Sequence, residues 1–342
     1  MNATKQQKIQ LAVGILVSII CLVAIFIFIP IKDVVAALRT ANYGYLGITT
    51  LSIIGFLILR AIRWRFMLNN SVPYSQIFHI QNIGYMLTNI LPFRLGDVAR
   101  GVLIGNVPPV TLAQGVSTMV MERILDLLFI VTLLPFAFAS VENLPEGAQG
   151  AQGAARVVGY IALLAVVVMI IAANMRPRAR QIATFILNKI PFLKTETWVK
   201  VIDDLLAGLS SLTRLRDGAI LLVLSVVTWL PIIIAYYYGM LGVGLEPSWA
   251  IAAVTVCGAA LGIAAPSSPG QVGVFEGAVI ATMILIGQPE DKAFAFALLY
   301  HAINFITMNI LGVIGLRGIG STWQNVVHMA QSFRRKPVVE KQ

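Results

Sequence analysis

The stretch NILPFRLGDVARG places three charged side chains around a break, made by Pro92 and Gly96, in an otherwise apolar run. We expect a helix to begin just after Pro92. Arg94, Asp97 and Arg100 then follow at three-residue intervals, which places them on nearly the same face of the helix. Asp97 can therefore pair with either arginine. A helix N-terminus beside arginine side chains is a favourable binding site for a phosphate. The alternative is that these charges lie at the membrane interface and follow the positive-inside bias.

A second group of charges lies in the stretch MERILDLL. Arg123 and Asp126 are three residues apart and Glu122 and Asp126 four apart, so we expect all three on one face of an apolar helix. An unpaired charge in hydrocarbon costs at least about 2.5–3.5 kcal/mol, so the group must face a protein interior or a wet cavity. A purely structural ion pair between helices is the alternative, although burial makes such a pair a poor source of stability.

The third stretch is PSSPGQVGVFEG. Four residues in it prevent a continuous helix: Pro266, Pro269, Gly270 and Gly273. Glu276 falls in the first turn of the following helix, where a carboxylate suits the positive end of the helix dipole. The alternative to a binding site is a kink with a dipole-capping glutamate.

A fourth stretch, LLYHAINF, places Tyr300, His301 and Asn304 within an apolar span, with Tyr300 and Asn304 on one helix face. For these polar residues we favour hydrogen bonds to a neighbouring helix over contact with a ligand. The candidate substrate-binding residues from all four stretches are Asn89, Arg94, Asp97, Arg100, Glu122, Arg123, Asp126, Gly270, Gly273, Glu276, Tyr300 and Asn304.

Signals of catalysis and of cofactors are missing from the sequence. His79, His301 and His328 are too scattered to predict a metal site. No Walker loop and no serine nucleophile elbow occurs. We therefore expect neither an enzyme nor a cofactor, and we assign no catalytic residue.

The composition is that of an integral membrane protein. The chain has 342 residues, of which 58% are hydrophobic and 12% charged, and its mean hydropathy is +0.84. Its net charge of +10 is concentrated in short stretches that flank apolar runs, which favours contact with anionic lipid headgroups over nucleic acid. Cys21 and Cys257 lie in apolar runs and are predicted to be small buried side chains rather than a disulfide.

The elements that must position these residues are transmembrane helices. Two apolar regions, 76–105 and 250–287, are broken, and each half is too short to cross a hydrocarbon core of about 30 Å. We predict that both form re-entrant helical hairpins in an all-α membrane protein. The predicted full spans are 9–30, 44–66, 111–139, 157–175, 218–240 and 294–316, and the first is predicted to be retained rather than cleaved.

The distribution of Lys and Arg predicts the orientation. Arg60, Arg63 and Arg65, the basic stretch within 176–216 and the basic tail should be cytoplasmic, as should both termini. The two hairpins would then enter the membrane from opposite sides, as in transporters built from inverted repeats.

The breaks themselves support such a repeat. Pro92 and Gly96 have the same spacing as Pro269 and Gly273, with a carboxylate following in each case, although chance could produce the match. We predict one polytopic membrane domain over residues 1–330 and a solvated basic tail over 331–342. Within the domain, 176–216 should lie on the cytoplasmic face as an amphipathic segment, or dock a partner protein.

The sequence resembles a known family. NILPFRLGDVAR, ERILDLL and PSSPGQVGVFE, in this order, resemble the lysylphosphatidylglycerol synthase transmembrane family, also called flippase-like or UPF0104, over about residues 10–320. The resemblance implies a protein of the prokaryotic plasma (inner) membrane with inverted re-entrant elements, implicated in moving lipids or lipid-linked molecules. By position, the family motifs match Arg94, Gly96, Asp97 and Arg100, then Glu122, Arg123 and Asp126, then Pro269, Gly270, Gly273 and Glu276.

Three departures from the family pattern stand out. Asp97 stands where glutamate is usual, and Gln271 follows Gly270 where a second glycine is common. Bifunctional members carry an aminoacyl-transferase domain after the membrane part, and no such domain follows residue 316 in this sequence. The resemblance therefore does not imply synthesis of lysyl-phosphatidylglycerol.

The leading hypothesis is a lipid translocase with a nearly balanced polar cavity. Arginines would take a headgroup phosphate, carboxylates would take a cationic amine, and rocking of the two repeats would expose the site to each leaflet in turn. Transport would be downhill or coupled to an ion gradient. The alternatives are an accessory subunit of a lipid- or glycan-synthesis enzyme, or a membrane-embedded lipid transferase with Asp97 or Glu276 as general base.

Overall fold

The computed structural model describes residues 39–90, 95–142, 144–187, 215–264 and 269–321, and within these ranges the regular structure is entirely helical. The prediction of an all-α protein is confirmed for this part of the chain. The helices are α3 (Tyr43–Met67), α4 (Tyr74–Ile90), α5 (Leu95–Gly105), α6 (Leu112–Ala139), α7 (Glu146–Gln149), α8 (Ala151–Asn174), α9 (Arg176–Leu187), α11 (Leu215–Gly242), α12 (Trp249–Gly262), the 3₁₀ turn η3 (Pro269–Gln271), α13 (Val274–Leu285) and α14 (Glu290–Gly318).

Three described helices are long and apolar enough to cross a membrane: Tyr43–Met67, Arg216–Gly242 and Glu290–Gly318. They correspond to the predicted spans 44–66, 218–240 and 294–316. The predicted spans 111–139 and 157–175 are the continuous helices α6 and α8, of 28 and 24 residues. The predicted span 9–30 lies outside the described residues.

Local sequence explains where several helices begin. The Asn42 side chain accepts hydrogen bonds from the first N–H groups of α3, and Ser248 accepts one from Ile251 at the start of α12. Thr111 and Gln114 form a reciprocal capping box at the start of α6. These caps satisfy N–H groups that have no partner within the helix.

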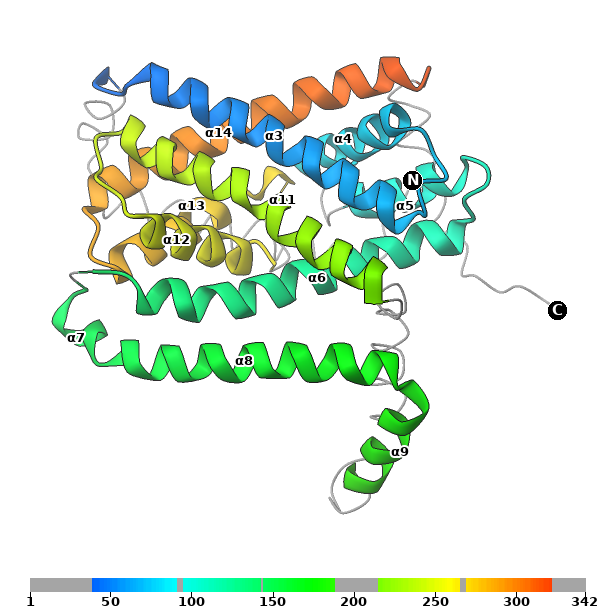
Figure 1. The fold of residues 1–342 in the computed structure, drawn as a ribbon. Coiled ribbons are helices and arrows are strands. Elements are labelled where there is room, and N and C mark those ends of the chain that lie inside the picture. The colour runs from blue at the N-terminus through cyan, green and yellow to red at the C-terminus, as the bar shows by residue number, and fades with distance from the viewer. Residues whose placement is uncertain (1–38, 91–94, 143, 188–214, 265–268, 322–342) are drawn as a thin grey trace, which may run out of the picture.

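The long helices α3, α11, α14 and α6 run along a common direction and enclose the shorter ones (Figure 1). α3 packs along α11, α14 packs against α4 and α13, and α6 packs against α5 and α12. α8 lies alongside α6 at the outer edge of this bundle (Figure 1), where Tyr160 meets Phe136 edge-to-face. Cys257 is a buried free thiol in the apolar core, in agreement with the prediction.

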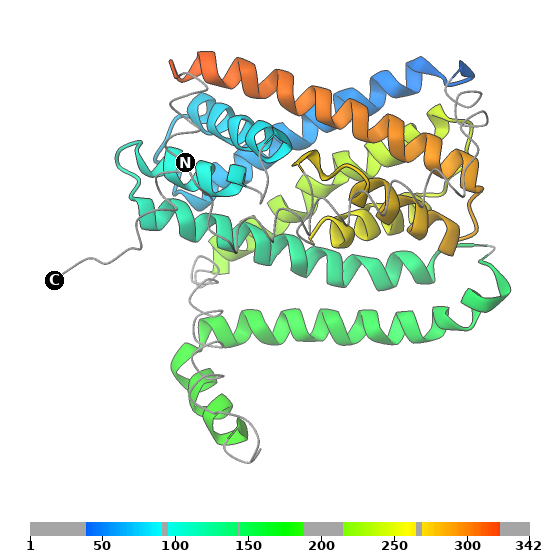
Figure 2. The same cartoon turned by 180° about the vertical axis from the view of Figure 1, so that it is seen from behind.

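The two broken regions are helical hairpins. The first hairpin is α4 and α5, and the second is α12 and α13 with η3 at its turn. They lie toward opposite ends of the long helices in both views (Figures 1 and 2). The end of α4 meets η3, because a Cβ added to Gly270 of η3 would lie 3.3 Å from the Asn89 carbonyl oxygen.

Glycines allow the two arms of the first hairpin to pack closely. A Cβ on Gly96 would lie 1.9 Å from the Gly84 carbonyl oxygen, and one on Gly84 would lie 2.1 Å from Cγ of Arg100. The expectation that Gly96 breaks the chain is wrong, since α5 begins at Leu95 and Gly96 lies in its first turn. Gly96 is required for close approach of the two arms rather than for the break.

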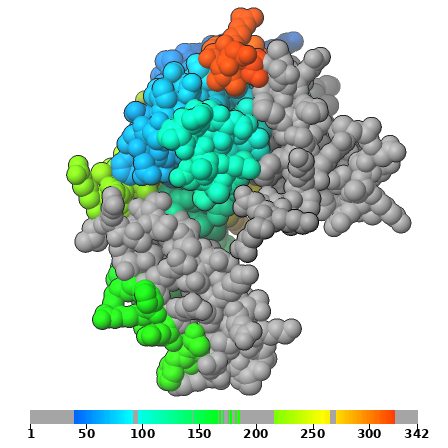
Figure 3. All heavy atoms as spheres, turned by 90° about the vertical axis from the view of Figure 1, so that its right-hand side faces the viewer, coloured from blue at the N-terminus to red at the C-terminus, as the bar shows by residue number. Residues whose placement is uncertain are grey.

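The segment predicted to be amphipathic, 176–216, is described only in part. Helix α9 covers Arg176–Leu187, and the apolar positions from Trp198 to Leu212 lie outside the described residues. Figure 3 shows the end of the molecule formed by α4, α5 and the end of α14, with α9 set apart from that group.

Candidate functional site

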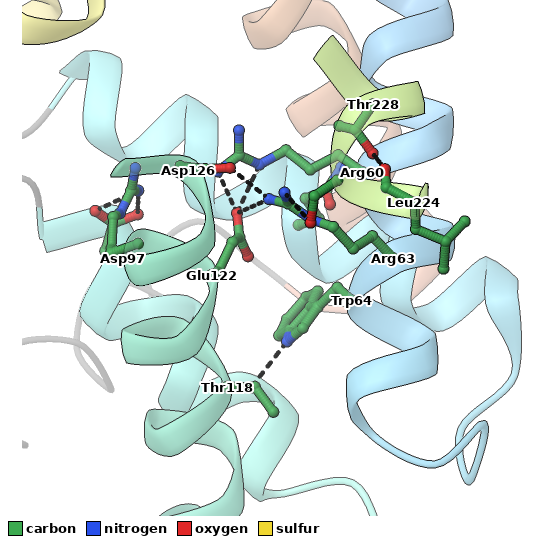
Figure 4. A network of polar contacts seen from close by, with 12 residues as sticks. Arg60, Arg63, Trp64, Asp97, Thr118, Glu122, Asp126, Leu224 and Thr228 are labelled. Atoms are coloured by element: carbon green, nitrogen blue, oxygen red, sulfur yellow. Dashed lines mark hydrogen bonds and ion pairs between the residues drawn. The ribbon is translucent and has the colours of Figure 1, made fainter. Parts of the chain in front are cut away.

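A buried ion network joins α3 to α6 (Figure 4). Arg60 of α3 donates to Glu122 Oε1 at 2.6 Å and to Asp126 Oδ2 at 2.7 Å. Arg63, one turn further along α3, donates to Asp126 Oδ1 at 2.8 Å. All four side chains are less than a tenth exposed.

The first hairpin adds a third arginine to this network. Arg100 of α5 donates to Glu122 Oε2 at 2.8 Å, and its guanidinium lies 4.5 Å from the centre of the Trp64 ring. Three arginines against two carboxylates leave one formal positive charge among the described residues of the network, counting each group as ionised.

The cytoplasmic side predicted for Arg60 and Arg63 stays a prediction, but neither residue is an exposed flanking charge. Arg60 is 6% exposed and Arg63 is fully buried, and both neutralise the carboxylates of α6. The positive-inside pattern cannot separate a flanking arginine from one that turns inward. The available signal was their three-residue spacing on an apolar helix, which puts both on one face.

Asp97 and Arg123 form a separate pair. Nη2 of Arg123 donates to both carboxylate oxygens of Asp97, at 2.8 and 2.9 Å, and the two side chains are 44% and 24% exposed. We predicted that Asp97 pairs with Arg94 or Arg100. Arg100 pairs with Glu122, and Arg94 lies outside the described residues.

Glu122 and Asp126 enter one network, as their spacing predicted, whereas Arg123 forms a separate contact. Consecutive helix residues are rotated by about 100°, so Arg123 pairs with Asp97 of α5, while Glu122 and Asp126 bond to Arg60 of α3 and Glu122 also bonds to Arg100 of α5. Figure 4 shows the Asp97 pair lying apart from the buried network.

A cavity of about 450 Å³ lies between the two hairpins, α3, α6, α11 and α14. It brings together seven of the predicted site residues: Asn89, Asp97, Arg123, Asp126, Gly270, Tyr300 and Asn304. Arg100 and Glu122 stand behind its wall in the buried network, and Gly273 and Glu276 support the second hairpin beside it.

The cavity contains hydrogen-bond donors that have no partner in the described part of the chain. These are the Tyr85 hydroxyl, the Asn89 side-chain NH₂ and the Trp229 indole N–H, contributed by α4 and α11. Sequence reasoning missed Tyr85 and Trp229, because a tyrosine or tryptophan in an apolar helix is usually a packing residue. A buried donor without a partner costs about 1–3 kcal/mol, so these three groups point to a ligand that accepts hydrogen bonds.

His301 ties the turn of the second hairpin to α14. Its Nδ1 lies 2.6 Å from Glu276 Oε1, and its Nε2 lies 2.8 Å from the Gly270 carbonyl oxygen. Glu276 Oε2 accepts from the Gly273 N–H at 2.7 Å, so the carboxylate lies in the first turn of α13 as predicted. The expectation that polar groups in this apolar span hydrogen-bond a neighbouring helix is confirmed for His301, although the sequence did not identify Glu276 as its partner.

The turn has an unusual backbone. Gly270, Gln271 and Gly273 all have positive φ, at 68°, 60° and 84°. Glycine adopts such angles without strain, whereas an L-residue such as Gln271 pays a steric cost. Gln271 is therefore a position where this chain carries backbone strain.

Tyr300 and Asn304 both reach the cavity wall, although we expected hydrogen bonds to a neighbouring helix. The Tyr300 ring also packs against Tyr236 of α11, with ring centres 4.3 Å apart, and stacks on Phe275 of α13. Tyr300 therefore joins the second hairpin to the long helices.

The fold and the site define an all-helical membrane protein in which two helical hairpins meet at an amphipathic internal cavity. The family model for the lysylphosphatidylglycerol synthase transmembrane region matches residues 11–312, and the chain belongs to this family.

Two archaeal proteins are similar over most of their length. A UPF0104 membrane protein of Methanothermobacter thermautotrophicus is 23% identical over 309 residues, covering 87% of this chain and 90% of the relative. Another, from Methanocaldococcus jannaschii, is 24% identical over 228 residues, covering 67% of this chain and 92% of the relative. No solved structure matches the chain.

Proposed function

We propose that this protein moves a lipid with an anionic, acceptor-rich headgroup between the two leaflets of the membrane, without converting it chemically. The observation that carries the proposal is the set of three donors, on Tyr85, Asn89 and Trp229, that have no partner among the described residues, in a cavity that Arg60 and Arg123 also line. A phosphate presents several acceptor oxygens and a negative charge, so it can satisfy several donors at once.

The charges around the cavity favour an anion over a zwitterion that needs a carboxylate partner. Asp126 accepts from Arg60 and Arg63, and Asp97 accepts from Arg123, so the charges of both carboxylates are already neutralised by arginines. The buried network behind the wall carries a formal surplus of positive charge. The earlier hypothesis, in which carboxylates hold a cationic amine, is therefore replaced by one in which the headgroup need only be anionic.

The rest of the wall suits the hydrocarbon part of a lipid. Apolar side chains from several helices line it, and two of them, Leu127 of α6 and Leu261 of α12, are 53% and 44% exposed. A cavity with donors at one part of its wall and exposed apolar residues at another is complementary to an amphipathic ligand. The membrane family to which the chain belongs is consistent with such a ligand.

The proposed movement uses the two hairpins as inverted re-entrant elements. Their placement toward opposite ends of the long helices, with the end of α4 in contact with η3, is the arrangement in which rocking of one half exposes a central site to each side in turn. In this proposal both termini and the first hairpin face the cytoplasm of a prokaryotic cell.

The test is lipid movement in vesicles reconstituted with the purified full-length protein. Fluorescent phosphatidylglycerol, labelled on an acyl chain, is the anionic test lipid, and identically labelled phosphatidylethanolamine is the comparison. Reduction by external dithionite reports which leaflet holds the label. We expect wild-type protein to move phosphatidylglycerol faster than protein-free vesicles do, and faster than it moves phosphatidylethanolamine.

Variants connect this activity to the cavity. Tyr85→Phe and Asn89→Leu each remove one of the donors, and each should slow phosphatidylglycerol movement about tenfold or more. Tyr160→Phe, on α8 outside the cavity, is the matched control and should have no effect. Movement at the protein-free rate would contradict the proposal, a covalently altered lipid would support a transferase, and activity only with an added enzyme would support an accessory subunit.

A further inference from the structure

The contacts of His301 require more protons than a neutral histidine carries. Both ring nitrogens face acceptors, namely a Glu276 carboxylate oxygen at 2.6 Å and the Gly270 carbonyl oxygen at 2.8 Å. A neutral imidazole has one N–H and can make only one of these hydrogen bonds to an ionised carboxylate and a carbonyl.

Two protonation states satisfy the geometry. In one, a doubly protonated imidazole donates to an ionised Glu276 and to Gly270. In the other, a neutral imidazole donates from Nε2 to Gly270 while a protonated Glu276 donates to Nδ1. Both states hold one proton more than a neutral histidine beside an ionised glutamate.

When that proton is lost, one ring nitrogen of His301 faces another acceptor with no hydrogen between them. Either Nδ1 faces the Glu276 oxygen with a lone pair, or Nε2 faces the Gly270 carbonyl in the same way. Glu276 keeps its hydrogen bond from the Gly273 N–H in every state, so the contact that fails is the one between α14 and the turn of the second hairpin. The turn is strained at Gln271, which has a φ of 60°, and Gly270 abuts Asn89 of the first hairpin.

The pair is shielded from bulk solvent but can exchange protons with the cavity. Glu276 is 4% and His301 8% exposed, and His301 and Gly270 both belong to the cavity wall. The other titratable or charged groups that line this cavity are Arg60 of α3, Tyr85 of α4, Asp97 of α5, Arg123 and Asp126 of α6, Tyr236 of α11 and Tyr300 of α14. α12 contributes apolar lining, with Cys257 buried behind it.

Asp97 and Asp126 in the cavity wall are each ion-paired with arginine, whereas the contacts of His301 with Glu276 and Gly270 cannot both form without the additional proton. Adding a proton to this pair makes the cavity wall less negative, which favours an anionic headgroup there.

We propose that His301 and Glu276 form a proton-binding site that couples proton binding to substrate movement, the proton entering the cavity together with the anionic headgroup. This inference rests on the proposed function. The bound proton closes the second hairpin onto α14, and its release to the cavity water frees the point where the two hairpins meet. Because the headgroup and the proton stabilise each other, they bind and leave together, and a pH difference across the membrane drives the lipid toward the more alkaline side.

A first experiment measures the hairpin without any lipid substrate. Cys21→Ala and Cys257→Ala remove the native thiols, and Gln271→Cys places a reporter at the turn. The rate of labelling by a small methanethiosulfonate reagent is followed from pH 5.5 to 8.5 in phosphatidylcholine nanodiscs. After correction for the reactivity of a free thiol at each pH, we expect the rate to rise about tenfold as pH rises and the pair loses its proton.

Glu276→Gln gives the sharpest contrast. A glutamine can donate to Nδ1 of His301 and accept from the Gly273 N–H, so it holds the closed arrangement with no exchangeable proton. Labelling should therefore stay slow at every pH, while Glu290→Gln, an exposed acid in the first turn of α14, should keep the wild-type profile. His301→Gln should also lose the pH dependence. A flat profile in the otherwise unaltered reporter protein, or a retained profile in both Glu276→Gln and His301→Gln, would overturn the proposal.

A second experiment separates this inference from the proposed function. Movement of acyl-labelled phosphatidylglycerol is measured in vesicles with and without a pH difference of about two units, which corresponds to a 100-fold proton gradient. The gradient should accelerate the wild type toward the alkaline side and leave Glu276→Gln unaffected. Lipid movement that ignores the gradient in the wild type overturns the coupling and leaves the function standing. A pH-dependent turn with no lipid movement overturns the function and leaves the proton site standing.

Discussion

The two hairpins have the same outline and are held in place by different interactions. Each is a pair of short helices packed closely at glycines, and the end of α4 meets η3 beside the cavity. The first is anchored by permanent charges, with Arg100 bonded to Glu122 and Asp97 to Arg123. In the described part of the second hairpin Glu276 is the one charged side chain, and its bond to His301 depends on a single proton.

This difference separates an anchored half of the molecule from a responsive one. The buried network joins α3, α5 and α6 through several charge-assisted hydrogen bonds, and no change near neutral pH removes them all. In the second hairpin, the contact between Glu276 and His301 is lost when one proton leaves. We therefore expect the first hairpin to stay fixed while the second moves, and the following substitutions test that comparison.

The largest effect is expected for Glu122→Gln. This change leaves Arg60, Arg63 and Arg100 with Asp126 as their one remaining carboxylate in the network, and removing one partner of a buried ion pair costs about 3–5 kcal/mol. The free energy of unfolding, measured by SDS titration in mixed micelles, should fall by that amount. Asp97→Asn, in the partly exposed pair, is the control and should cost about 1 kcal/mol or less. Equal losses in Glu122→Gln and Glu276→Gln would remove the distinction between the two hairpins.

Glycine substitutions should destabilise both hairpins but differ in whether they can be rescued. A Cβ at Gly262 would lie 2.2 Å from the Ala278 Cβ, whereas one at Gly96 meets the backbone oxygen of Gly84. Each alanine should cost about 1–3 kcal/mol from overpacking. Ala278→Gly should restore much of the stability of Gly262→Ala.

No such exchange exists for Gly96→Ala, because the atom in the way belongs to the backbone. Gly47→Ala in α3, where a Cβ meets nothing within 4 Å, is the control and should be neutral or slightly stabilising. Full stability of Gly96→Ala in the same SDS titration would show that the arms of the first hairpin are not as close as described.

The smallest effect is expected at the strained turn. Gln271→Gly should raise the free energy of unfolding by about 1 kcal/mol, because glycine adopts a φ of 60° without the steric cost of a side chain. Gln288→Gly, in the loop before α14 and outside the positive-φ set, should instead be neutral or slightly destabilising. A destabilised Gln271→Gly would mean that contacts of the Gln271 side chain outweigh the strain.

The helical architecture could be read from the sequence because its causes are local. Hydropathy and run length predicted the spans that correspond to α3, α11 and α14, and Pro and Gly marked both breaks. The carboxylate in the first turn of α13 was predictable for the same reason, since Gly273 and Glu276 are three residues apart. Seven of the candidate residues line the cavity. They could be selected from the sequence because each lies beside such a break or is a polar residue in an apolar run.

The partners of the charges could not be read in this way. Arg60 meets Glu122 across 62 residues, and His301 meets Glu276 across 25, so these contacts depend on how helices pack against one another. Tyr85 and Trp229 gain their meaning only when packing leaves their polar atoms inside a cavity with no partner in the described chain.

By itself, then, the sequence determined that this chain is a helical membrane protein with two broken segments and more charge than hydrocarbon tolerates unpaired, since hydropathy and helix breaking act over a few residues. Only the tertiary structure decided which charges neutralise one another and which donors remain for a ligand. Long-range packing brings distant helix faces into contact, and no property of a short stretch specifies the side chain that a distant helix will present.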